Sequence, residues 1–99
     1  MARMTHDQLQ SAMISKLSAE PDPSGRADLI CPKGSLGIAA DNKQIKKTVK
    51  RLRPLEGYRY LVINRADLFA ASPATIGTKI GILDANGSLL KAADLPRTR

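Results

Sequence analysis

The chain has few of the residues on which most enzyme sites and metal sites depend. Its 99 residues include one histidine, His6, one cysteine, Cys31, and no tryptophan. A lone cysteine forms no internal disulfide, which favours a reducing compartment, and one histidine with one cysteine gives no zinc-ligand spacing. The acidic residues are scattered, so no pair of carboxylates receives an acid–base role. We expect a protein that is not an enzyme and that binds neither a metal ion nor a cofactor.

Aromatic residues and long apolar runs are also scarce. Tyr58, Tyr60 and Phe69 are the only aromatic residues. Base-stacking recognition of single strands needs aromatic platforms, so this scarcity argues against that mode. No apolar run approaches the roughly 18 residues of a membrane span, and the N-terminus lacks the apolar segment of a secretory signal. We therefore expect a cytoplasmic protein with no membrane partner.

The remaining composition is that of one small folded domain covering residues 1–99. Hydrophobic residues make up 42% of the chain, enough for one aliphatic core in a domain of this length. Residues 1–4 and 95–99 are expected to fray, and the proline-containing stretch 20–26 is expected to be a linker within the domain.

Positive charge is what the chain has in excess. Sixteen lysines and arginines face nine acidic residues, a net charge of +7, which attracts phosphate backbones or acidic protein surfaces. Six of the sixteen lie between residues 43 and 53, where helical spacing places them within an arc of about 160°. These six are Lys43, Lys46, Lys47, Lys50, Arg51 and Arg53. Ile45, Val49 and Leu52 form an apolar stripe on the opposite side, so the helix can pack through one face and present cations on the other.

The first half of the chain contains signals for two helices and one short strand. Thr5 and Gln8 form a capping-box pattern that predicts a helix over residues 6–19. Residues 27–31 are a strand candidate, residues 32–37 look like a turn, and residues 36–40 could form one helical turn. Asp41 and Gln44 predict the start of the basic helix, 42–53, and Pro54 ends it.

The second half favours strands. Residues 57–63 are rich in aromatic and β-branched residues and predict the clearest strand. Residues 65–71 could form a helical turn that stops before Pro73, and residues 75–83 and 88–92 predict a hairpin around the turn at residues 84–87. The expected fold class is α+β: an N-terminal helix and a basic helix packed on a small, mostly antiparallel sheet with a C-terminal β-hairpin.

Two tyrosines on the predicted strand 57–63 suggest a contact surface. Tyr58 and Tyr60 are two residues apart and share one face, while Arg59 lies on the other with Leu61 and Ile63. Tyr58, Arg59 and Tyr60 are candidate interface residues, because tyrosine and arginine are enriched where proteins meet. The simpler interpretation is that the tyrosines cover one side of the sheet.

Residues 27–63 resemble the βααβ core of KH-type nucleic-acid-binding modules. In that family an isoleucine precedes a Gly-x-x-Gly turn that clamps the nucleic-acid backbone, and a helix with basic residues follows. Ile38 matches the isoleucine and residues 39–42 occupy the turn, although both glycines are missing. The resemblance implies backbone binding by the start of the basic helix. A winged-helix arrangement, with the basic helix as recognition helix, is the competing interpretation.

Two functions of different classes remain open from the sequence. The first is a small basic, non-catalytic DNA- or RNA-binding accessory or regulatory protein that contacts phosphates through residues 42–53. The second is an inhibitor or adaptor, of mobile-element origin for instance, that docks on a larger protein or a nucleic-acid-handling complex. The partner would then offer an acidic surface to this basic chain. A homodimer through the edge of the hairpin at residues 75–92 is compatible with either function.

Overall fold

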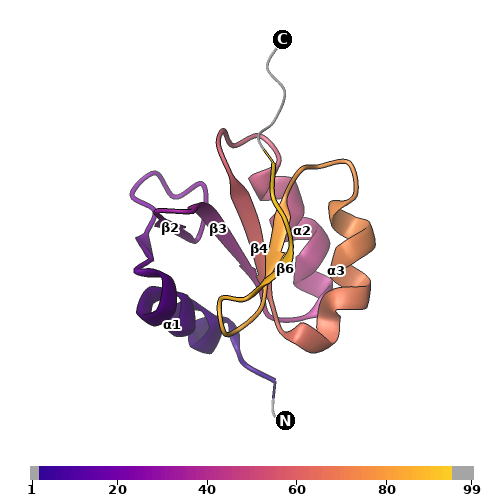
Figure 1. Cartoon of the computed structure of the whole chain (residues 1–99), viewed down its shortest axis with the longest axis horizontal. Helices are drawn as coiled ribbons and strands as arrows, with labels where there is room; N and C mark the ends of the chain where they lie inside the picture. The colour runs from indigo at the N-terminus through magenta and orange to yellow at the C-terminus, as the bar shows by residue number, and fades with distance from the viewer. Residues whose placement is uncertain (1–2, 95–99) are drawn as a thin grey trace.

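The computed structural model describes residues 3–94, and helices and strands alternate along most of this range (Figure 1). The elements are α1 (His6–Leu17), β1 (Glu20–Pro21), β2 (Leu29–Cys31), β3 (Gly34–Ala39), α2 (Asn42–Leu52), β4 (Arg59–Ile63), the 3₁₀ turn η1 (Arg65–Asp67), α3 (Leu68–Thr75), β5 (Gly81–Leu83) and β6 (Leu89–Lys91). Within residues 3–94, no helix is both long enough and apolar enough to cross a membrane.

The six strands form one open sheet in which spatial order equals chain order, β1-β2-β3-β4-β5-β6. The outer pairs β1–β2, β2–β3 and β5–β6 are antiparallel, whereas the central pairs β3–β4 and β4–β5 are parallel. Each parallel pair needs a crossover, and α2 and α3 supply the two crossovers. The predicted α+β class with a mostly antiparallel sheet and a C-terminal hairpin is therefore confirmed.

The helices cover the two faces of the sheet unequally. α1 lies on one side, while α2 and α3 lie on the other (Figure 1). Alternation along β4 divides the core: Leu61 and Ile63 pack with α2 and α3, whereas Val62 packs with α1. The central strands β3, β4 and β5 are thus buried on both faces, and the outer surfaces of the helices meet the solvent.

Several local predictions in the first half are wrong. Residues 36–40 do not form a helical turn, because most of them belong to strand β3, and the turn before it is shorter than predicted. The KH-type interpretation needs a short helix at 36–40 and the winged-helix interpretation needs one at 35–40, and neither helix is present. The strand at 27–31, the basic helix and the strand at 57–63 correspond to β2, α2 and β4. The predicted linker 20–26 contains the edge strand β1, where Pro21 is tolerated.

The second half also differs from the prediction. Residues 75–80 are not extended: α3 continues through Pro73 to Thr75, and the hairpin strand begins only at Gly81. The hydroxyl of Thr75 is buried and donates to the Ala71 carbonyl at 3.2 Å, which fixes the last helical turn. The hairpin turn at Asp84 is as predicted, since its carboxylate accepts from the Asn86 and Ser88 amides at 2.8 and 3.0 Å.

The described part of the N-terminus is held in place rather than frayed. Arg3 pairs with the carboxylate of Asp67, with Nη1 and Oδ1 2.9 Å apart, and this ion pair raises the pKa of Arg3. The Asn64 side chain accepts from the Met4 amide and donates to the Met4 carbonyl, at 2.8 and 2.9 Å. Residues 3 and 4 thus have contacts with the body of the protein, and the expected fraying stays a prediction; residues 1–2 and 95–99 lie outside the described residues.

Candidate functional site

Helix α2 begins at the N-cap and ends before the proline that the sequence predicts for it. The Asp41 carboxylate accepts a hydrogen bond from the Gln44 amide at 3.1 Å, which confirms it as the N-cap. Gln44 Oε1 accepts a hydrogen bond from the Ala40 amide at 3.1 Å, which connects the start of the helix to the end of β3. Pro54 follows the last helical turn, as predicted.

The inner face of α2 packs closely on the sheet. Ile45, Val49 and Leu52 are at most 5% exposed and share a core cluster with β4 and β5. Gly37 on β3 allows the close approach, because a methyl group in its place would lie 2.7 Å from Thr48 Cγ2 and 2.9 Å from Leu52 Cδ1. The orientation of α2 about its own axis is therefore fixed by packing.

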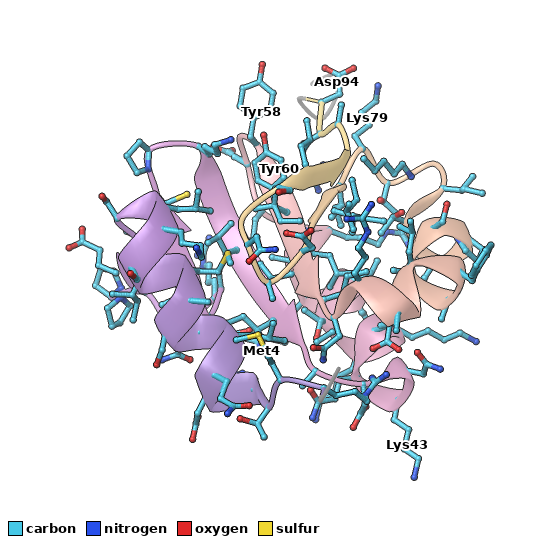
Figure 2. All side chains as sticks on the ribbon, turned by 60° about the horizontal axis from the view of Figure 1, so that its bottom comes forward. Met4, Lys43, Tyr58, Tyr60, Lys79 and Asp94 are labelled. Atoms are coloured by element: carbon cyan, nitrogen blue, oxygen red, sulfur yellow. The ribbon has the colours of Figure 1, made fainter. Side chains whose placement is uncertain are left out.

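All six predicted cations lie on the solvent side of α2 or directly after it. We name Lys43, Lys46, Lys47, Lys50, Arg51 and Arg53 the cationic face, and each of the six is exposed. Figure 2 shows Lys43 extending away from the body of the protein at the start of the helix. The helix spans about 16 Å at 1.5 Å per residue, so the cationic face is a strip of positive charge of that length.

Little negative charge compensates this strip. Within residues 3–94, Arg51 is the only member with an ion pair: its Nη1 lies 3.4 Å from Asp28 Oδ1. Asp28 Oδ2 accepts from the Ile38 amide at 2.8 Å, and His6 Nε2 lies 3.9 Å from Oδ1, so the carboxylate is fixed between strand and helix. Asp28 therefore orients Arg51, while the lysines keep their charges available to a ligand.

A shallow hollow of about 550 Å³ extends the positive region beyond the end of α2. Its lining residues are Gly25, Arg26, Arg51, Pro54 and Leu55. Asp22 shapes the adjoining loop: its carboxylate accepts from the Ala27 amide at 3.0 Å and from Ser24, and these hydrogen bonds lower the pKa of Asp22. Arg26 is exposed and adds a seventh cation to the six of the cationic face. Helical periodicity could not predict it, because Arg26 lies on a separate loop.

The three candidate interface residues on β4 separate into different environments. Tyr58 is 43% exposed, and Figure 2 shows it at the opposite end of the molecule from Lys43. Tyr60 is half-buried, and burial raises its pKa, with smaller contributions from Tyr58 and Cys31.

Arg59 is not available to a partner, because it is 1% exposed. Its Nη1 donates to the carbonyl oxygens of Leu52 and Arg53 at 3.3 and 2.9 Å, and Nη2 donates to that of Thr78 at 2.9 Å. The prediction of Arg59 as an interface residue is therefore wrong. Its place beside Leu61 and Ile63 in the strand alternation was the signal that it faces the core.

A second hollow, of about 320 Å³, lies where β4 and β5 end. It borders Asn64 and Asp84, among other residues. Both side chains already serve the fold, since Asn64 holds Met4 and Asp84 closes the hairpin turn. Nor do three or more His, Cys, Asp or Glu side chains converge anywhere in residues 3–94 in a way that could hold a metal ion. The cationic face is thus the better candidate site.

Comparison of the chain with protein-family models, with curated proteins and with solved structures finds no match.

Proposed function

We propose that this protein is a small non-catalytic nucleic-acid-binding protein that contacts phosphates through the cationic face of α2. The observation that carries the proposal is the exposure of all six cations with a single ion pair among them. A helix that only closed the fold would gain stability from interleaved acidic residues, because like charges three and four positions apart repel one another. α2 has no acidic residue within its bounds, so its sequence fits an external polyanion better than the fold alone.

The geometry of α2 suits phosphate contacts. Buried Ile45, Thr48, Val49 and Leu52 hold the helix on the sheet, so the cations point outward from a rigid support. Lysine contacts phosphates as a point charge, and arginine adds the planar fork that binds phosphate through two hydrogen bonds. We propose that the lysines neutralise the backbone while oriented Arg51 and exposed Arg53 reach further contacts.

Charge reversal tests this function. Six phosphate contacts predict a slope of about −5 for the logarithm of duplex affinity against the logarithm of salt concentration. The double variant Lys46→Glu/Lys50→Glu should bind on the order of 100-fold more weakly at about 50 mM salt, with a slope shallower by about 2. Fluorescence anisotropy with labelled duplex DNA, single-stranded DNA and RNA at about 50 and 200 mM salt measures both quantities.

The matched control is Lys16→Glu/Lys33→Glu, which changes net charge equally at exposed positions away from α2. It should stay within a few-fold of the wild type. Equal losses in both variants would show that net charge alone matters, and an unchanged Lys46/Lys50 variant would exclude the cationic face as the site.

The alternative is an inhibitor or adaptor that docks on an acidic protein surface. The half-exposed Tyr58 at the opposite end of the molecule favours it, since such a side chain is typical of protein contacts. Absence of binding to all three nucleic acids at about 50 mM salt, where phosphate contacts are strong, would exclude the nucleic-acid function and favour this one.

A further inference from the structure

Phe69 is the most exposed large apolar side chain among residues 3–94. It is 95% exposed, and Ile76, the residue directly after α3, is 71% exposed. Phe69 and exposed Pro73 are four positions apart on one side of α3, and Ile76 follows the helix directly; we name these three residues the apolar stripe. The opposite side of α3 is buried through Ala71 and Thr75, so the stripe points away from the sheet.

The apolar stripe and the cationic face lie on neighbouring helices. α2 and α3 lie in contact on the same side of the sheet, and Ile45, Val49, Leu52 and Ala71 share one core cluster. Each helix turns its buried side toward this shared cluster, and its exposed side points away from it. Packed helices stand about 8–10 Å apart, so the helix that carries Phe69 is the direct neighbour of the helix that carries the cations.

An exposed aromatic ring beside a cationic strip is the arrangement that proteins use to hold unpaired nucleotides. Cations follow the backbone while bases stack on the aromatic face, and each stacked base contributes about 1–3 kcal/mol. Bases within a duplex are already stacked on both sides, so the ring adds nothing for duplex ligands. The chain has few aromatic residues, but one of them, Phe69, is exposed on the helix next to α2.

We infer that the site takes single-stranded nucleic acid, with the backbone on the cationic face of α2 and one base stacked on Phe69. This inference rests on the proposed function and names its ligand class. A protein partner would also meet the stripe through apolar side chains, but the uncompensated charge beside it favours a polyanion with exposed rings.

The test compares variants whose side chains make little contact with the fold. Phe69→Ala should weaken binding to a labelled single-stranded oligonucleotide by about 5- to 100-fold, the equivalent of one lost stacking contact. Phe69→Tyr should bind like the wild type, because it keeps the ring. The matched control Ile76→Ala removes exposed apolar area without removing a ring, and should change affinity less than about threefold.

Ligand arms separate this inference from the proposed function. DNA and RNA single strands of equal length report which sugar is preferred. A hairpin duplex with the same number of phosphates should bind the wild type and Phe69→Ala with equal affinity. Single-strand binding that is unchanged in Phe69→Ala, or lost equally in Ile76→Ala, would overturn the stacking role. In that case salt-dependent binding by α2 would still stand, whereas failure of all nucleic acids to bind would remove both.

Discussion

At the residue scale, Arg59 is a cation held inside the protein by carbonyl oxygens. Its three described hydrogen bonds go to the carbonyls of Leu52, Arg53 and Thr78, and its Nε finds no acceptor among residues 3–94. Two of these carbonyls close α2, where the negative end of the helix dipole favours a cation. Burial lowers the pKa of Arg59, as expected for a charge removed from water. Arg59 thus links the end of α2 to the turn before β5.

Replacement of Arg59 by methionine should destabilise the fold. Methionine fills most of the volume, but it leaves the carbonyl oxygens of the helix end and of Thr78 without their donor. We expect a free energy of unfolding about 1–3 kcal/mol below that of the wild type, by urea denaturation. The control Arg53→Met, at the neighbouring exposed position, should stay within about 0.5 kcal/mol. Equal stability of the two variants would show that the buried guanidinium contributes nothing net.

At the element scale, contact between α2 and β3 depends on the absence of a side chain at Gly37. A Cβ there would overlap Thr48 and Leu52, which both face the sheet from α2. Gly37→Ala should therefore push α2 outward and lower the unfolding free energy by about 1–3 kcal/mol, as overpacking of a core does. Gly25→Ala, at an open site with a positive φ of 73°, measures instead the cost of a left-handed backbone, which Gly37 does not have. If Gly37→Ala is as stable as the wild type, the helix does not rest on this contact.

The elements with strong local signals could be predicted from the sequence. Thr5 and Gln8 form both bonds of the capping box, with Thr5 Oγ1 accepting from the Gln8 amide at 3.2 Å and Gln8 Oε1 accepting from the Thr5 amide at 2.9 Å. α2 followed from its cap, its apolar spacing and Pro54, and the hairpin turn followed from Asp84 and Gly87. For the same reason the cationic face could be predicted residue by residue, because helical periodicity alone determines it.

Elements set by tertiary contacts could not be predicted. β3 is buried on both faces, so its residues lack the polar alternation that marks a strand, and residues 36–40 were compatible with a helix. Pro73 lies inside α3 although proline usually ends a helix; both Pro73 and Phe69 are exposed, so water can bond the Phe69 carbonyl that proline leaves without a donor. The exposure of Phe69 likewise depends on which neighbours the fold supplies, whereas the alternation along β4 already indicated that Arg59 faces the core.

At the scale of the whole molecule, one outer surface combines two features that each reduce solubility or stability on their own. The two crossover helices both cover the same side of the sheet (Figure 1), so the uncompensated cations of α2 and the exposed apolar stripe at α3 belong to neighbouring helices. α1, on the other side, carries acidic and basic residues together, with Asp7 in its first turn and Lys16 in its last. This asymmetry is why we propose the helical layer of α2 and α3, and not the side of α1, as the binding surface.

This arrangement predicts opposite effects of one substitution on stability and on binding. Lys47 stands three or four positions from Lys43, Lys50 and Arg51, and each like-charged pair costs a few tenths of a kcal/mol at low salt. Lys47→Glu turns these repulsions into attractions, so the free variant should melt about 4–8 °C above the wild type at about 50 mM salt, equivalent to about 1 kcal/mol. The gain should shrink at about 500 mM, where charges are screened over a few ångströms.

The same variant should bind nucleic acid more weakly, because it loses one phosphate contact and gains a repulsive carboxylate. Lys33→Glu, an exposed change of equal charge in the turn between β2 and β3, should gain little in melting temperature and keep its affinity. A Lys47→Glu variant that melts at or below the wild type at low salt would show that the cations do not strain the helix. Higher stability with lower affinity would show that the cationic face is kept at a cost to the fold, which is the behaviour of a surface maintained for a ligand.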